Sequence, residues 1–516
     1  MAFFGALQSL ITIEVMVCLM VGTVAGIVIG ALPGLSASMG VALLLPVTFK
    51  LTPVGGIVML ATVYTSATYG GSISAILLHT PGTPGNAATA IEGFKLTQQG
   101  KGLKAIGVST ISSVIGGLFG ALMLIFLSPP LAKLSLFFSA PEYMFMAIFG
   151  LTIIGSMAGD NVAKGLISGA FGLFLGSVGL DFMTGIPRYT FGFLYLENGI
   201  SMVPAMIGMF SISQVLVSVE EIVKGNKSIV NDSVALLKGS VFPTKEEMKI
   251  LTPTLIRSSI IGTIIGILPG AGTDIGSWYS YNEAKRWAKK PELIGKGSIE
   301  GLCACEAANN AVCGGALIPL ITLGIPGSGV AAIMLGGFLI HGLIPGWDLF
   351  SRSGNTIYAI MIGYLFANIL MGIIGLAIAR PVVKVAKVSM IILCPIIVAL
   401  SAIGSYAINN SAFDVYLMSL FGILGYFMRK TGFGAAPFVL GIILSNMVEA
   451  NFRRSLVLAR GSNVVLYFLS RPISLVLILL IGLAVCAPFI IKRITVKMNK
   501  DIKAADVDIS EKRDDM

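Results

Sequence analysis

The sequence predicts an all-α integral membrane protein whose helices are partly broken or re-entrant. Hydrophobic residues make up 55% of the 516-residue chain and charged residues only 12%, with a mean hydropathy of +0.90. A soluble domain carries about twice that share of charge, so this chain needs lipid around it. Many apolar stretches approach the ~20 residues that cross a bilayer, and Gly or Pro interrupts several of them. Together they predict roughly ten to thirteen spans.

The two halves of the chain repeat each other in sequence. Residues 26–40 match residues 262–276 without a gap, including Leu-Pro-Gly at 32–34 and at 268–270. Further along, Gly82, Pro84 and Gly85 match Gly324, Pro326 and Gly327. Matching blocks in the same order predict a duplication. We therefore divide the chain into a first membrane repeat (1–219), a polar cytoplasmic linker (220–249), a second membrane repeat (250–463), an extra C-terminal transmembrane helix (464–491) and a cytoplasmic tail (492–516).

Basic residues predict that the two repeats are inverted. Lys95, Lys101 and Lys104 lie in a first-half loop whose second-half counterpart is almost neutral, whereas the basic run 285–290 has a neutral counterpart near Lys50. Lys and Arg mark cytoplasmic loops, and inverted repeats are typical of transporters. The basic tail places the C-terminus in the cytoplasm. The same topology puts Arg453, Arg454 and Arg460 outside, against the rule, where we expect them to face an acidic docking surface on another protein.

Gly/Pro-rich breaks in matching positions of the two halves predict a central substrate site. At membrane depth, the backbone groups freed by Gly and Pro are tolerated only where protein, water or ligand satisfies them. Helix starts carry partial positive charge, which suits carboxylates. The alternative is tight helix packing through small residues. The predicted substrate-binding residues are Pro33, Gly34, Ser36, Ser38, Ser72, Ser74, His79, Thr83, Gly85, Asn86, Gly270, Gly272, Thr273, Asn309, Asn310, Gly327 and Ser328.

Two acidic residues near the breaks are predicted to bind the coupling cation. Asp274 stands where the first repeat has Ser38, and Glu306 lies just before an apolar run. A carboxylate at bilayer depth is costly and is usually functional. The alternatives are a helix N-cap for Asp274 and a solvated cap at the membrane surface for Glu306. The sequence leaves open whether the cation is Na⁺ or H⁺.

The remaining polar residues predict neither an enzyme nor a metal site. The alternative for His79 is a packing role, and Cys303, Cys305 and Cys313 are expected to be small buried packing residues. No phosphate loop, Ser/His/Asp arrangement or metal-ligand spacing stands out, which argues against an ATP-driven pump or a hydrolase. The N-terminus lacks a basic region before its apolar stretch, so no cleaved signal peptide is expected.

These residues resemble the large membrane subunit of the tripartite tricarboxylate transporters. The resemblance runs from about Gly22 to Pro472 and is carried by Gly30-Ala-Leu-Pro-Gly-Leu35, residues 69–77, Pro81-Gly-Thr-Pro-Gly85, residues 267–272, Glu306-Ala-Ala-Asn-Asn310, residues 314–319 and residues 324–328. It departs from the family pattern at His79, Asn86 and Cys305.

The resemblance implies a multi-pass permease of the bacterial inner membrane that needs no cofactor. Its partners would be a small membrane subunit and an extracytoplasmic solute-binding protein. It would be a symporter, a secondary transporter in which an ion gradient drives uptake of a tricarboxylate or dicarboxylate. The alternatives are a stand-alone ion-coupled carboxylate transporter and, from another class, a channel or membrane scaffold.

Overall fold

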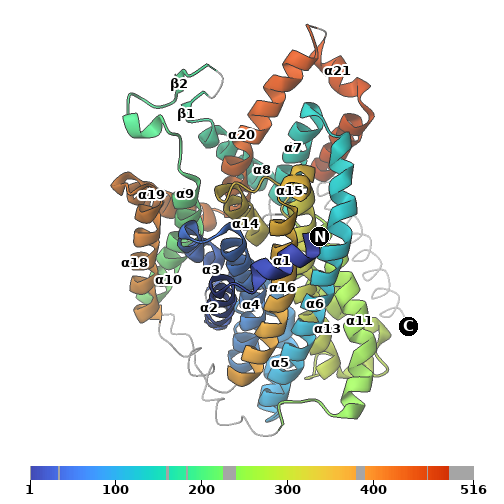
Figure 1. Cartoon of the computed structure of the whole chain (residues 1–516). Helices are drawn as coiled ribbons and strands as arrows, with labels where there is room; N and C mark the ends of the chain where they lie inside the picture. Colours follow the sequence, from blue (N-terminus) through green and yellow to red (C-terminus); the bar gives the residue numbers. More distant parts are fainter. Residues whose placement is uncertain are drawn as a thin grey trace, which may run out of the picture.

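The computed structural model describes residues 2–32, 35–157, 162–181, 184–224, 240–378, 390–461 and 463–486. These ranges are almost entirely helical, which confirms the predicted all-α membrane class (Figure 1). Nine helices in them are long and apolar enough to cross a bilayer, or ten if one bent pair counts as a single span. Nine lies just below the predicted ten to thirteen spans, and ten lies at their lower end.

The elements follow one another in a simple order. In the first part they are α1 (Ala2–Leu10), α2 (Ile13–Ala31), α3 (Ala37–Leu44), η1 (Leu45–Lys50), α4 (Pro53–Leu78), η2 (Pro84–Asn86), α5 (Ala87–Gln98), α6 (Gly102–Leu134), η3 (Ser135–Phe137), α7 (Ala140–Met157), α8 (Val162–Gly176), β1 (Gly179–Leu180), β2 (Pro187–Arg188), η4 (Leu194–Leu196), α9 (Met202–Ile207), η5 (Gly208–Ile212) and α10 (Ser213–Val223). In the second part they are α11 (Lys245–Ile267), α12 (Gly272–Trp287), η7 (Pro291–Leu293), α13 (Ile299–Leu323), α14 (Gly329–Ile340), α15 (Trp347–Arg352), α16 (Gly354–Ile378), α18 (Met390–Asn409), α19 (Ala412–Lys430), α20 (Ala435–Leu458) and α21 (Val464–Ser470). Strands β1 and β2 pair antiparallel in one hairpin.

The C-terminal segment, expected as one transmembrane helix over 464–491, is bent in the structure. Helix α21 and a second helix, Pro472–Cys486, meet at 98°. Proline lacks a backbone N–H and disfavours helical geometry in the residue before it, so the chain turns at Arg471. Arg471 is held there by hydrogen bonds of 2.6 and 3.0 Å to Glu142 on α7. Residues 487–491 lie outside the described part of the chain.

The two first breaks have the same backbone geometry. Helix α2 ends at Leu32 (φ −84°, ψ 118°) and helix α11 ends at Leu268 (φ −75°, ψ 117°), both in extended conformation. Contacts around the second breaks also correspond. A Cβ on Gly82 would collide with the carbonyl oxygen of Gly30, and one on Gly327 would lie 2.6 Å from that of Gly266. By these contacts the counterpart of Gly82 is Gly327, whereas the sequence match pairs Gly82 with Gly324, three residues earlier.

Helices α4 and α13 form the centre of the molecule. All but a few residues of α4, and nearly all of α13, are buried by protein. The C-terminal end of α4 bonds to α5, because the Thr97 hydroxyl donates to the Ile76 carbonyl. The start of α13 lies at the same helix, because the Ser298 amide donates to Glu92 on α5. The two central helices therefore run in opposite directions. This arrangement favours inverted repeats, whose inversion stays a prediction.

The molecule has two distinct ends (Figure 1). At the lysine end, which we define by Lys95, Lys101, Lys104 and Lys296, Lys104 pairs with Glu247 at the start of α11 at 2.8 Å. At the opposite end, the hairpin end, the β1–β2 hairpin is bonded to α20 through Arg188 and Glu449. Apolar side chains exposed along α2 and α11, such as Val24 and Ile260, cover the sides between the two ends and face lipid.

Candidate functional site

Two broken segments meet at one buried asparagine. The turn after the second break, residues 83–86, leads into α5, and the turn after Leu268 leads into α12. Asn309, on the central helix α13, lies between them. A Cβ on Gly85 would collide with Asn309 Oδ1 and would lie 2.7 Å from Thr273 Oγ1. The starts of two helices and one amide side chain thus converge within contact distance, as the breaks predict.

The Asn309 side chain has no hydrogen-bond partner in the described part of the chain. Its Oδ1 and Nδ2 are both buried, and the residue has no exposed surface. Leaving a buried polar group unpaired costs about 1–3 kcal/mol. An amide kept in this state between two helix starts is suited to bind a ligand that supplies both a donor and an acceptor, or ordered water.

Glu306 lies one turn before Asn309 and is completely buried. Its Oε1 accepts hydrogen bonds from the Thr89 hydroxyl and from Asn86 Nδ2 at 3.4 Å. Its Oε2 accepts from the Ser109 and Ser113 hydroxyls, each at 3.0 Å. The predicted site residue Ser72 joins this group through a 2.7 Å hydrogen bond to Ser109. The alternative that Glu306 is a solvated cap at the membrane surface is therefore wrong.

Small residues on α6 bring its serines to Glu306. Ser109, Ser113, Gly116 and Gly120 are spaced by four, three and four residues and so share one helix face. A Cβ on Gly116 would collide with the Ala307 carbonyl, and one on Gly120 would lie 2.8 Å from that of Ala311. The glycines let α6 and α13 approach closely, and the serines one turn earlier then reach the carboxylate.

A second polar cluster links α4 to α13, α14 and α16. Asn310 Nδ2 bonds to the Thr65 hydroxyl at 3.0 Å, and the same hydroxyl donates to Asn368 at 2.7 Å. Ser328, the N-cap of α14, bonds to the Tyr64 hydroxyl at 3.0 Å. These predicted residues, Asn310 and Ser328, are mostly paired inside the protein, which favours a role in holding the central helices together.

Other predicted residues do not join the Asn309–Glu306 group. His79 ends α4 in left-handed geometry (φ 56°), is exposed and stacks on Phe94 at 4.7 Å. Asp274 is exposed in the first turn of α12. Ser36 caps α3 and bonds to Ser38 at 2.9 Å. Gly270 lies in the turn before α12 and bonds through its N–H to the Gly327 carbonyl, and Gly272 starts α12. Ser74 lies within α4 and bonds to the Gly71 carbonyl. Pro33 and Gly34 lie outside the described residues.

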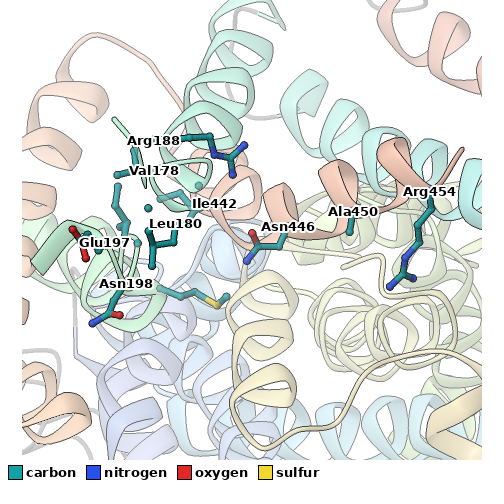
Figure 2. Close-up of a pocket in the computed structure, with 14 residues that line it drawn as sticks. Val178, Leu180, Arg188, Glu197, Asn198, Ile442, Asn446, Ala450 and Arg454 are labelled. Atoms are coloured by element: carbon teal, nitrogen blue, oxygen red, sulfur yellow. The ribbon is translucent and has the colours of Figure 1, made fainter. Parts of the chain in front are cut away.

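A pocket of about 460 Å³ opens at the hairpin end (Figure 2). Its polar lining comes from Arg188, Glu197, Asn198, Asn446 and Arg454. Figure 2 shows Asn446 and Arg454 on one helix, α20, with Glu197 and Asn198 on the opposite side. The pocket was not predicted from the sequence, and it lies apart from the Asn309–Glu306 group.

An ion-pair cluster fixes the hairpin to α20 beside this pocket. Arg188 binds both Glu449 oxygens at 2.6 and 3.1 Å, and this hydrogen bonding raises the pKa of Arg188. Arg453 binds both Asp181 oxygens at 3.0 and 2.5 Å and also Glu449 at 2.6 Å. Arg453 is thus engaged inside the chain, so the expectation that it faces a partner's acidic surface is corrected. Arg454, which lines the pocket, is exposed.

Sequence reasoning missed the hydroxyl groups that bind Glu306. Thr89, Ser109 and Ser113 come from α5 and α6, and nothing local in the sequence links them to residue 306. One signal was available, because Ser109 and Ser113 stand four residues apart, in a cluster of hydroxyl residues within a largely apolar helix. Two hydroxyls on one face of such a helix indicate a buried polar partner.

Comparison with known proteins identifies the family. Residues 16–440 match the Tripartite tricarboxylate transporter TctA family. The chain is 36% identical over 483 residues to an uncharacterised 52.8 kDa protein in the TAR-I ttuC' 3'region of Agrobacterium vitis, covering 93% of this chain and 94% of that protein. It is 37% identical over 213 residues to an uncharacterised protein in the TAR-II ttuC' 3'region of the same organism, covering 41% of this chain and 87% of that protein. No solved structure matches. The family match spans most of the chain, which therefore belongs to the tripartite tricarboxylate transporter TctA family.

Proposed function

We propose that this chain is the large permease subunit of a binding-protein-dependent secondary transporter, which takes up a small tricarboxylate or dicarboxylate across the bacterial inner membrane. The observation that carries the proposal is the buried, unpaired amide of Asn309 at the meeting point of two helix starts. Membership of the TctA family supports the transport class. An ion gradient would drive the uptake, with Glu306 rather than exposed Asp274 as the coupling site.

The surroundings of Asn309 suit a carboxylate without a basic side chain. The turn that leads into α5 and the start of α12 both lie at this point, and the positive ends of the two helix dipoles there favour a negative charge. The Asn309 amide and the Thr273 hydroxyl add side-chain donors. A carboxylate can accept several such hydrogen bonds at once, and hydrogen bonds to a charged group are about twice as strong as neutral ones.

The two ends of the molecule support an orientation. Lysines gather at the lysine end, which we assign to the cytoplasm together with the C-terminus. The hairpin end would then face the solute-binding protein, with its pocket and the exposed Arg454 available to a partner. The small membrane subunit would contact the apolar sides. Rim charges mainly change association rates and their dependence on salt, so Arg454 would help docking more than binding of the substrate.

The test is uptake by proteoliposomes that contain the full chain with its two partner subunits, across a panel of labelled carboxylates. We expect Thr273→Val to lower uptake about tenfold or more at low substrate concentration, because a site built around a hydrogen bond discriminates strongly against its loss. Thr252→Val is the matched control, since Thr252 is an exposed helix residue that bonds only to the Met248 carbonyl.

Each rival function has its own signature in the same assay. Saturable, gradient-driven uptake by the chain alone would favour a stand-alone transporter. Ion current without coupled uptake would favour a channel. Equal uptake by Thr273→Val and Thr252→Val would remove the site from the region around Asn309.

A further inference from the structure

The hydrogen bonds around Glu306 define what the carboxylate can bind. Each of its oxygens receives two donors, all from uncharged groups: Thr89, Asn86, Ser109 and Ser113. No Lys, Arg or His hydrogen-bonds or ion-pairs with it in the described ranges. A buried carboxylate without an opposite charge is costly and favours uptake of a positive charge.

The orientation of the Asn86 amide argues for a proton over a metal ion. Its Nδ2 lies 3.3 Å from the Thr68 carbonyl oxygen and 3.4 Å from Glu306 Oε1, while its Oδ1 accepts a hydrogen bond from Thr83. A carbonyl only accepts hydrogen bonds, so the atom that faces both Thr68 and Glu306 must be the nitrogen. Asn86 therefore presents N–H, and not oxygen, toward Glu306. Hard cations need a shell of oxygen ligands, which this N–H group obstructs.

A chain of hydroxyl groups can accommodate Glu306 in both protonation states. Ser109 lies 3.0 Å from Glu306 Oε2 and 2.7 Å from the Ser72 hydroxyl, which lies 2.7 Å from the Tyr69 carbonyl. With Glu306 ionised, Ser72 donates to Ser109 and Ser109 donates to Oε2. With Oε2 protonated, the two bonds that join Glu306, Ser109 and Ser72 reverse, and Ser72 turns its proton to a carbonyl: Glu306 donates to Ser109, Ser109 to Ser72, and Ser72 to the Tyr69 carbonyl. Each hydroxyl has one proton, so both directions are complete.

Among the described residues, the other titratable groups around Glu306 leave it the best placed to exchange protons. They come from each neighbouring element and are Tyr69 on α4, Glu92 on α5, Lys104 at the start of α6, Arg257 on α11, Tyr281 on α12, and Glu300, Cys303 and Cys305 on α13. Glu92 is bound by three backbone amides and Tyr281, and Lys104 pairs with Glu247. None of these groups hydrogen-bonds to Glu306 within the described residues.

We propose that Glu306 carries the coupling proton of transport. This deepens the proposed function and rests on it. A proton from water on the outer side forms an O–H bond with Oε2, the hydroxyl chain reverses, and the loss of negative charge permits an anionic substrate to occupy the Asn309 site nearby. After the site opens to the cytoplasm, the O–H bond breaks and the proton leaves to water with the substrate. The class of coupling ion is thus H⁺ and not Na⁺.

The decisive variant is Glu306→Gln in the complete transporter in proteoliposomes. A glutamine can place its carbonyl toward Thr89 and Asn86 and its NH₂ toward the two serines, so it imitates the protonated form. We expect its accumulation ratio under an imposed pH gradient to fall to about one, while exchange of labelled for unlabelled substrate continues. The wild type should accumulate substrate about tenfold per pH unit for each coupled proton, without Na⁺. Glu246→Gln, at an exposed position in the first turn of α11, is the matched control and should behave as wild type.

The possible outcomes separate the two proposals. If wild-type accumulation needs a Na⁺ gradient and does not respond to the pH gradient, the proposal that Glu306 carries a coupling proton is wrong, and the proposed function still stands. Full pH-driven accumulation by Glu306→Gln would have the same meaning. If the wild type neither accumulates nor exchanges any carboxylate, the proposed function itself fails.

If Glu306→Gln does not reach the membrane, Ser72→Ala provides the test. It removes the acceptor for Ser109 in the protonated state and should shift the pH of half-maximal uptake downward by about half a unit. An unchanged pH profile in this variant contradicts the hydroxyl chain.

Discussion

Alanine at position 85 would place one methyl group into the proposed substrate site. The Gly85 backbone does not need positive φ, so the effect of Gly85→Ala is steric. The new Cβ would lie 2.7 Å from Thr273 Oγ1, where ordinary contact begins at 3.4 Å, and closer still to Asn309 Oδ1. Both side chains must therefore move by about 0.7 Å or more. Overpacking of this size costs about 1–3 kcal/mol.

We expect this displacement to affect transport much more than folding. Shifts near 1 Å at a reacting or binding group can cost about 10²-fold. Gly85→Ala should thus lower the uptake rate at low substrate by at least tenfold while the protein still reaches the membrane. Thermal unfolding in detergent and initial rates of uptake in proteoliposomes measure the two effects. Gly354→Ala is the control, because a Cβ there meets nothing within 4 Å.

A double variant distinguishes a blocked site from a distorted fold. Asn309→Ala in the Gly85→Ala background removes one of the two side chains that clash, so it should recover part of the stability without recovering uptake. The coupling between the two positions follows from the double-mutant cycle. Near-normal uptake by the double variant would refute the reasoning, because transport would then need neither the amide of Asn309 nor an open space beside Gly85.

Three further predictions concern other parts of the molecule. Glu92→Gln should lower the free energy of unfolding by about 3 kcal/mol or more, because the charged carboxylate of Glu92 binds three backbone amides and Tyr281. A loss below about 1 kcal/mol in chemical unfolding would contradict this. Arg453→Ala should loosen the hairpin, measured as faster proteolysis there, whereas Arg454→Ala should keep the hairpin protected and change only the salt dependence of uptake. Asp274→Asn should cost about 0.3–1 kcal/mol as a lost helix-dipole interaction and leave cation dependence unchanged; a changed dependence would restore Asp274 as the coupling site.

The sequence predicted the class of protein and that the broken segments come together, for physical reasons that are local. Hydropathy identifies spans, and Gly and Pro identify the breaks that bring Gly85 and Thr273 to Asn309. It could not predict which helices supply the serines for Glu306, because that depends on the close contact of α6 with α13. The exposure of His79 could not be predicted either, since it follows the buried helix α4 at a left-handed helix end that leads into the exposed residues Thr80 and Pro81. The hairpin and its pocket depend on ion pairs between positions about 270 residues apart, such as Asp181 and Arg453, which no short-range pattern reveals.

The anchoring of Glu92 limits how this protein can change shape. Its carboxylate binds the amides of Gly295, Gly297 and Ser298, and the Lys95 side chain binds the Gly295 carbonyl nearby. Helix α5 is thereby joined to the chain just before α13, so neither can slide past the other without breaking several hydrogen bonds at once. The residues that bind Glu306 from α5 and the Asn309 amide on α13 must then travel together as one mechanical unit. Exposure of the site to one side of the membrane or the other has to come from movement of this unit against the helices around it.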